Sequence, residues 1–140
     1  MTTLCTYLHI MPEARLPHFA ATTPFKAIVI IETEVSADWQ YKLCRDLIDA
    51  HCLYALAWGT CCSSWDDAFD WANLEKFDFG EIPEQEFVIT TWHENDTLFE
   101  VFEFAKNAAK HPTRELSKVL IVDIRTNSRE MELLALYDSA

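Results

Sequence analysis

The stretch TTWHENDT, residues 90–97, carries the side chains best suited to chemistry in this sequence. It stands where an apolar run, EFVI, gives way to a helical pattern, LFEVFEFAKNAAKH. His93 has an ordinary pKa near neutrality, so it could act as a general base or as a metal ligand, with Glu94 beside it. No second His stands at a metal-ligand spacing from it, and an exposed loop histidine is the simpler interpretation.

The other polar residues of this stretch have a structural explanation. One of Asn95, Asp96 and Thr97 is expected to cap the following helix, because such side chains accept a hydrogen bond from the first helical turn. Thr97 and Glu100 also have the spacing of a capping box. Capping leaves Trp92 and His93 unexplained.

Further polar or reactive side chains follow the other apolar runs of the chain, among them Glu32, Asp123 and Arg125. Cys61 precedes a predicted helix, whose dipole lowers the pKa of a thiol, although the acids that follow it oppose this effect. Packing in a tight loop is the simpler role for Cys61 and Cys62. A catalytic interpretation has His93 as base or ligand, Glu94 and Asp123 as orienting or ligating groups, and Cys61 as nucleophile.

An alternation of strands and helices would position these residues. Strands are expected at 24–32, 53–58, 86–92 and 117–124, and helices at 36–52, 63–77, 98–111 and 127–140. This order predicts an α/β fold, a three-layer α-β-α sandwich whose mainly parallel four-stranded sheet fills a single domain, residues 25–140. With the four strands numbered along the chain, we expect the spatial order 2-1-3-4.

Local signals refine the ends of these elements. Residues 1–24 hold three of the five prolines and are expected to form an irregular arm, in which TLCTYLHI could add one edge strand. Ser36 is expected to cap the first helix. Two pairs, Ser64 with Asp67 and Asn127 with Glu130, have capping-box spacing.

Composition excludes several classes of function. The net charge of −12 repels nucleic acid and anionic membranes, and it would attract a basic protein. The chain has two glycines, and the first strand-to-helix turn, ETEVSAD, has none, so no nucleotide cofactor is expected. No metal is expected either, because His93 has no second His at a ligand spacing. The five cysteines show no C-x-x-C pair, which indicates reduced thiols in the cytoplasm.

The segment WDDAFDWANLEKFDF, residues 65–79, suggests a binding surface. It lies within residues 63–86, which hold eight acids and one base. Aromatic anchors beside acids suit a basic protein partner. The expected contacts are Trp65, Asp66, Asp67, Asp70, Trp71 and Asp78.

Three hypotheses about function follow. The first is a small acidic protein-binding domain, of the immunity or inhibitor type, that neutralises a basic partner such as a nuclease toxin. The alternative is a hydrolase-like or metal-binding enzyme with its site at the strand ends around His93. The third is a homodimer that pairs through a surface aromatic patch.

Overall fold

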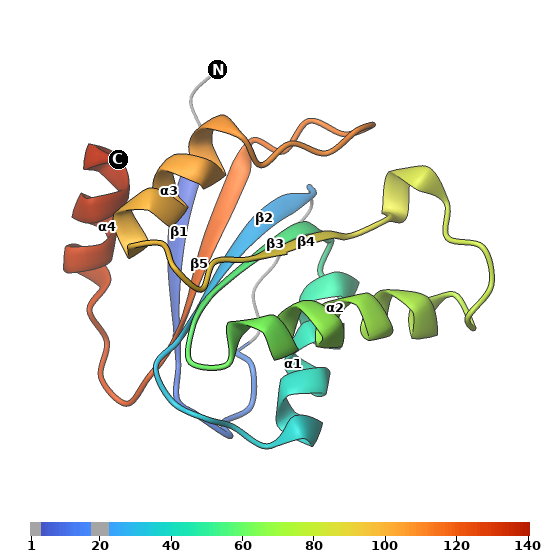
Figure 1. Ribbon diagram of the computed structural model, residues 1–140, viewed down its shortest axis with the longest axis horizontal. Coiled ribbons are helices and arrows are strands. Elements are labelled where there is room, and N and C mark those ends of the chain that lie inside the picture. The colour runs from blue at the N-terminus through green and yellow to red at the C-terminus, as the bar shows by residue number, and fades with distance from the viewer. Residues whose placement is uncertain (1–3, 18–22) are drawn as a thin grey trace.

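The computed structural model describes residues 4–17 and 23–140, which form a sheet between two pairs of helices (Figure 1). The strands of this part are β1 (Leu4–Ile10), β2 (Phe25–Ile31), β3 (Cys52–Gly59), β4 (Ile89–Trp92) and β5 (Lys118–Ile124). The helices are α1 (Ala37–Asp49), α2 (Cys62–Lys76), α3 (Leu98–Asn107) and α4 (Glu130–Ser139), with a 3-10 turn at Glu84–Glu86. The expected α-β-α sandwich is confirmed, with the N-terminal strand added to it.

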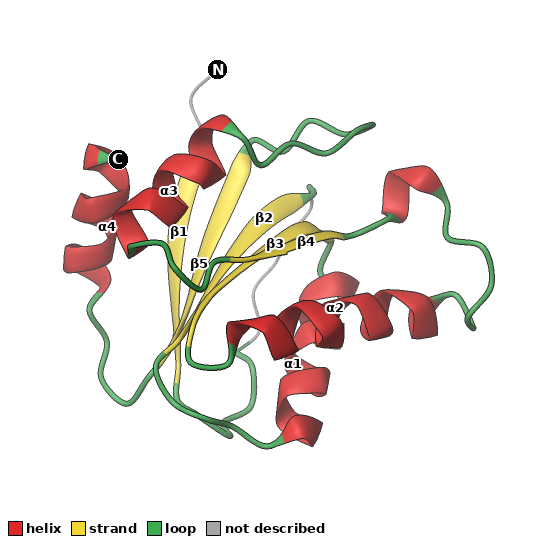
Figure 2. Ribbon diagram, viewed as in Figure 1, coloured by secondary structure: helices red, strands yellow, loops and turns green. Residues whose placement is uncertain are grey.

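The sheet is parallel throughout, in the order β1-β5-β2-β3-β4. Helices α1 and α2 cover one face, where the rings of Trp39 and Trp65 meet edge to face at 6.4 Å. Helices α3 and α4 cover the other, where Phe102 meets Tyr137 at 5.5 Å (Figure 2). Strand β2 lies in the middle, and all seven of its residues are buried.

The expected strand order was wrong. In the numbering of the four expected strands, the observed order is 4-1-2-3, and β1 lies outside strand 4. Strand β5 takes an inner position because six of its seven residues are buried, which requires cover on both faces and both edges. Strand β4 has four residues and none is buried, so it suits an edge.

Strand β1 confirms the N-terminal edge strand. It pairs in parallel with β5, from Leu4 beside Lys118 to Ile10 beside Ile124. Residues 11–17 of the expected arm follow it without a helix or strand. The rest of that arm, residues 1–3 and 18–22, lies outside the described residues.

Two of the expected helix caps are confirmed and two were wrong. The Ser36 side chain accepts from the Trp39 amide, and Thr97 and Glu100 form the full capping box. Helix α2 instead starts after Cys61, because Gly59 and Cys61 make a tight turn with positive φ angles of 112° and 53°. A Cβ on Gly59 would lie 2.1 Å from the Ile31 carbonyl oxygen, so this turn requires glycine.

The cap expected from Asn127 with Glu130 fails for a different reason. The N-cap residue of α4 is Arg129, and its side chain makes no capping hydrogen bond. Its guanidinium is held instead by carboxylates at the ends of β2 and β5. Those ion pairs fix the backbone where the helix begins.

The described part contains no helix long and apolar enough to cross a membrane.

Candidate functional site

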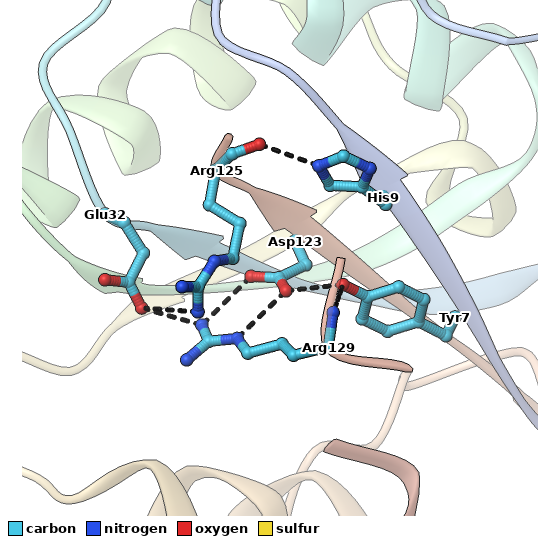
Figure 3. Close-up of polar contacts among 6 residues, drawn as sticks. All are labelled: Tyr7, His9, Glu32, Asp123, Arg125 and Arg129. Atoms are coloured by element: carbon cyan, nitrogen blue, oxygen red, sulfur yellow. Dashed lines mark hydrogen bonds and ion pairs between the residues drawn. The ribbon is translucent and has the colours of Figure 1, made fainter. Parts of the chain in front are cut away.

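The carboxyl ends of all five strands meet at one edge of the sheet, where ligands bind in open α/β folds. Between β2 and β5 the topology switches, because α1 leaves β2 toward one face and α4 leaves β5 toward the other (Figure 1). Glu32 follows β2, and Asp123 is the last residue but one of β5. This switch point holds a polar cluster, shown in Figure 3, that we call the switch-point cluster: Tyr7, His9, Glu32, Asp123, Arg125 and Arg129.

Asp123 is the centre of the switch-point cluster. Its side chain is fully buried and accepts from Tyr7 Oη at 2.6 Å. Arg129 donates from Nε and Nη2 to its two oxygens, each at 3.0 Å. Arg129 Nη2 also donates to Glu32 Oε1 at 2.7 Å, which links β2 to the start of α4. His9 joins β1 to the Arg125 carbonyl oxygen at 2.7 Å.

The charges of the switch-point cluster cancel. Two carboxylates, Glu32 and Asp123, face two guanidiniums, and Arg125 Nη1 lies 4.0 Å from Glu32. Burial by itself lowers the pKa of Arg129, but hydrogen bonds and the charges of Asp123 and Glu32 raise it above its ordinary value. Burial is also the main cause that raises the pKa of Tyr7, so its phenol stays a hydrogen-bond donor. The cluster therefore ties three strand ends to α4, and the Arg129 guanidinium is committed to Asp123 and Glu32. Arg125 Nε is buried without a hydrogen-bond partner.

The sequence interpretation missed half of this cluster. It singled out Glu32, Asp123 and Arg125 as strand-end residues but not Tyr7, His9 or Arg129. One signal was present: Asp123 interrupts the apolar run KVLIVDI, and a buried carboxylate requires a cation and hydrogen bonds. Arg129, six residues later, is one of the two arginines that could supply them.

His93 is not the exposed loop residue of the simpler interpretation. It is 7% exposed, and its ring meets Phe104 of α3 at 4.9 Å. Its Nδ1 lies 2.9 Å from Asp96 Oδ2, and its Nε2 lies 2.9 Å from Thr91 Oγ1. Both ring nitrogens are therefore engaged, in a carboxylate–imidazole–hydroxyl chain on the α3 face of β4.

Cys61 and Cys62 lie on the α1 and α2 face of the sheet. Cys61 is exposed, and its Sγ lies 3.7 Å from Glu34 Oε1. Cys61 and Glu34 line a hollow of about 380 Å³ at the start of α2. Cys62 is 2% exposed, and burial raises the pKa of its thiol. Cys62 therefore behaves as a packing residue.

The residues of the catalytic interpretation do not converge. His93 follows β4 and Asp123 lies in β5, and two strands separate these two in the sheet. The three spacings between neighbouring strands from β4 to β5 add up to about 14 Å. Cys61 lies over the opposite face from the His93 ring. Glu94 is exposed in the loop after His93. The described residues contain no group of three or more His, Cys, Asp or Glu that could hold a metal ion.

The acidic segment forms the outer face of α2 and the adjoining edge of the sheet. Asp67, Asp70, Trp71 and Leu74 are exposed, at the three- and four-residue spacing of one helix face. Asp70 accepts from the Thr90 hydroxyl at 3.0 Å, which joins this face to the edge strand β4. Trp92 projects to the same side of β4 as Thr90, two residues away.

Three large aromatic side chains are exposed in this region. Trp71 is 55% exposed, Phe79 is 53% exposed and Trp92 is 49% exposed. The rings of Trp71 and Phe79 contact each other, with centroids 5.1 Å apart. We define the acidic edge surface as Asp67, Asp70, Trp71, Asp78, Phe79 and Trp92.

Two of the expected contact residues do not belong to this surface. Trp65 is 1% exposed and packs against Trp39 in the core. Asp66 is 9% exposed, although its charge still acts on its neighbours. Burial is the main cause that raises the pKa of Asp70, and the charges of Asp66 and Asp67 raise it further. The helix period separates these residues: positions 65, 69 and 72 face the core, and positions 67, 70 and 71 face solvent.

The backbone after α2 is strained. Asp78 and Phe79 have positive φ angles of 53° and 59°, in a region that non-glycine side chains rarely adopt. The Phe79 amide donates to the Leu74 carbonyl at 2.9 Å, which closes the helix end. This conformation turns the Phe79 ring back onto Trp71. Strain of this kind at a surface aromatic pair is typical of functional sites.

Comparisons with known proteins place the chain in one family. No curated protein and no solved structure matches it. A family model matches residues 5–140, which is nearly the whole chain and includes the acidic edge surface and the switch-point cluster. The chain therefore belongs to the family described as Domain of unknown function (DUF7684).

Proposed function

We propose that this protein is a binding domain for a basic protein, and that it acts as an inhibitor or immunity-type protein. The observation that carries the proposal is the contact pair Trp71 and Phe79, which are exposed among carboxylates on α2. Exposed aromatic side chains of this size are the usual anchors of protein interfaces. Carboxylates around them steer a basic partner and speed its association.

The chemistry of the surface favours a basic partner over a second copy of the chain. Two acidic edge surfaces in contact would bring Asp67, Asp70 and Asp78 of each copy together, and like charges at an interface oppose association. A basic partner would instead relieve the repulsion that Asp66 and Asp67 exert on Asp70. Light scattering of the purified protein tests the homodimer directly, through its mass.

A cytoplasmic setting belongs to the same proposal. All five cysteines are free thiols. Burial raises the pKa of Cys44 well above its ordinary value and that of Cys52 to about 12. Such thiols are protonated and unreactive at neutral pH, and they need no disulfide partner. This supports a reducing compartment, and a nuclease toxin is the kind of basic protein that such a domain would meet there.

The first experiment captures partners from a lysate of the native host with the tagged protein and elutes them in rising salt. Three baits are compared: the native chain, Asp67→Lys with Asp78→Lys, and Glu103→Lys with Asp138→Lys. The last pair makes the same charge change at exposed positions of α3 and α4, on the opposite face. We expect one basic protein to bind the native chain and this control and to elute at moderate salt, because screening weakens exposed charge pairs.

Loss of that protein from the Asp67 and Asp78 bait alone would support the acidic edge surface as its binding site. Equal capture by all three baits would sink the proposal. With the purified partner, the association rate constant should fall about tenfold or more for the Asp67 and Asp78 variant at low salt, because steering contributes mainly to that rate.

The hydrogen-bonded chain of Asp96, His93 and Thr91 favours a second candidate function, a hydrolase-like enzyme. A carboxylate that orients an imidazole, which in turn meets a hydroxyl, is the arrangement that activates a nucleophile. The separation of His93 from Cys61 and Asp123 leaves Thr91 as the hydroxyl within reach. Hydrolysis of p-nitrophenyl acetate that disappears in both His93→Gln and Thr91→Val, with the fold intact, would support this function. Rates equal to those in buffer would count against it.

A further inference from the structure

A basic cavity lies at the amino ends of the strands. The switch-point cluster lies at the other, carboxyl ends of the strands. It has a volume of about 480 Å³ and is enclosed by the start of β2 and by the chain that follows α3. Four bases line it: Lys26, Lys106, Lys110 and Arg114. Glu115 is the one acidic side chain among its lining residues. We call this site the basic cavity.

The bases of the cavity lack aspartate and glutamate partners. Within the described part of the chain, no Asp or Glu oxygen lies within 4.0 Å of any of the four cations. Lys106 has partners of another kind: its Nζ donates to the Ala140 oxygen at 3.0 Å and lies 4.6 Å from the centre of the Tyr137 ring. The sequence shows the same imbalance, because residues 106–118 hold four bases and one acid in a chain whose net charge is −12. A local excess of positive charge favours an anion at this place, even in so acidic a protein.

Lys26 is the most unusual of the four. Its side chain is 7% exposed, and its Nζ donates to the Ala105 carbonyl oxygen at the end of α3, at 2.7 Å. That bond uses one of three N–H donors of the ammonium. Burial, and then the charge of Lys110, lower the pKa of Lys26. A buried ammonium with one acceptor and a second cation nearby is costly unless an anion completes its surroundings.

The wall of the basic cavity is held in place by hydrogen bonds. His111 is buried, and its Nε2 lies 2.7 Å from the Phe87 carbonyl oxygen. Its Nδ1 accepts from the Thr113 amide at 3.2 Å, so Nε2 carries the hydrogen and donates to Phe87. Arg114 donates to the Gln85 carbonyl oxygen at 3.5 Å. A loop fixed in this way need not be ordered when a ligand binds, which favours affinity.

We propose that the basic cavity binds a small anion through a phosphoryl group. A phosphoryl group offers several strong acceptor oxygens and up to two negative charges, and Lys26, Lys110 and Arg114 offer unpaired cationic donors around one hollow. Binding here needs no glycine-rich turn, which the strand ends lack. The site is independent of the acidic edge surface, since it has the opposite charge and involves α3 rather than α2.

The test is a titration of the full-length ¹⁵N-labelled protein with inorganic phosphate, followed by NMR at constant ionic strength set with sodium chloride. We expect saturable shifts of the amide signals of Lys26 and of residues 109–116. Chloride alone should produce none. Shifts that stay linear in phosphate, or that scatter over the whole protein, would overturn the proposal.

Variants assign the effect to the cavity. Lys110→Gln and Arg114→Gln change exposed residues, and each should weaken phosphate binding about tenfold, because each removes a charge-assisted hydrogen bond. Lys76→Gln on α2 makes the same charge change elsewhere and should leave the dissociation constant unchanged. Equal affinities for all three variants would contradict the proposal. Lys26→Met should abolish the phosphate-dependent rise in melting temperature, which reports on binding even if this variant is less stable.

Discussion

The acidic edge surface and the basic cavity differ in shape as much as in charge. On α2 the acids stand on an exposed helix face, beside aromatic rings that are about half exposed. After α3 the bases line a hollow, and Lys26 is 7% exposed. A convex surface with large anchors can be covered only by another protein, whereas a hollow with buried donors suits a small ion. The two charge clusters of this chain therefore point to two different kinds of ligand.

The switch-point cluster shows what the same side chains do when their charges are paired. Arg129 meets Asp123 and Glu32 at 2.7 to 3.0 Å, while Lys26 meets a carbonyl oxygen and no carboxylate of the described residues. The paired cluster joins β1, β2, β5 and α4. Its charges therefore have a structural role. The charges of the acidic edge surface and of the basic cavity have no such role, and ligand binding would account for them.

The largest expected effect is the loss of stability when a cation of the switch-point cluster is removed. Arg129→Met leaves the buried Asp123 carboxylate without a cation, so the free energy of unfolding should fall by about 3–5 kcal/mol. Urea denaturation at neutral pH measures it. Lys26→Met should reduce the free energy of unfolding by no more than about 1 kcal/mol, because it removes an unpaired charge together with one hydrogen bond. Equal losses for both variants would break the distinction between paired and unpaired cations.

The next effect concerns the two tryptophans of α2. Trp71→Ala should weaken binding of the basic partner by about 2 kcal/mol or more, roughly 30-fold, as expected for an aromatic anchor. Its free energy of unfolding should change by less than about 0.5 kcal/mol, since the side chain is 55% exposed. Titration calorimetry and urea denaturation provide the two measurements.

Trp65→Phe and Met131→Ala are the matched controls for Trp71→Ala. Trp65 lies in the core, so its variant should lose stability and keep its partner affinity. Met131 is 87% exposed on α4, far from α2, so its variant should change neither quantity. Partner affinity that depends on Trp65 and not on Trp71 would mean that the acidic edge surface is not the interface.

A smaller effect is expected at His93. His93→Ala removes hydrogen bonds to Asp96 and Thr91 and the contact with Phe104, and it should lower the free energy of unfolding by about 1–2 kcal/mol. Partner affinity should stay within twofold, because His93 is buried on the α3 face and the acidic edge surface lies along α2. A loss of partner binding greater than the loss of stability explains would extend the interface to the α3 face of β4.

The sequence was sufficient for the elements and for the layers. Runs such as FKAIVII and KVLIVDI predict buried strands, and the capping box at Thr97 predicts the start of α3 within a residue. The order of the strands was not predictable in this way, because it depends on which strands can be left at an edge. Strand β4 begins at Ile89 and not at residue 86, because a 3-10 turn precedes it and the Val88 amide donates to the Asn73 side chain. No residue among 86–88 predicts this later start of the strand.

The sites also differ in how far the sequence predicts them. Trp71 is one of the expected contact residues, and the structure shows that it is 55% exposed. The helix period should have removed Trp65 from the expected contacts. The switch-point cluster joins Tyr7 to Asp123, 116 residues apart, which no local pattern reveals. The basic cavity had a visible sequence signal in the bases of residues 106–118, although only the fold brings Lys26 among them.

The smallest expected effect is also the most direct comparison of the two unpaired clusters. The folded-state pKa of Asp70 is raised above its ordinary value of 3.8, so the folded state holds that proton more tightly than the unfolded state. Asp70 therefore contributes stability below pH 3.8 that is lost as pH rises through the raised pKa. Lys26 has the opposite sign: its folded-state pKa lies below 10.5, so stability is gained as pH rises from the lowered pKa toward 10.5.

Differences between each variant and the native chain isolate these two contributions, because the other titrating groups cancel. From pH 3.5 to 6.5, Asp70→Asn should gain stability relative to the native chain, by less than about 0.5 kcal/mol since solvent screens this exposed carboxylate. From pH 8 to 10.5, Lys26→Met should lose stability relative to the native chain. Phosphate should reduce the second slope, since an anion in the basic cavity raises the pKa of Lys26, and it should leave the first unchanged. A phosphate effect on the Asp70 slope would mean that the two regions are not independent.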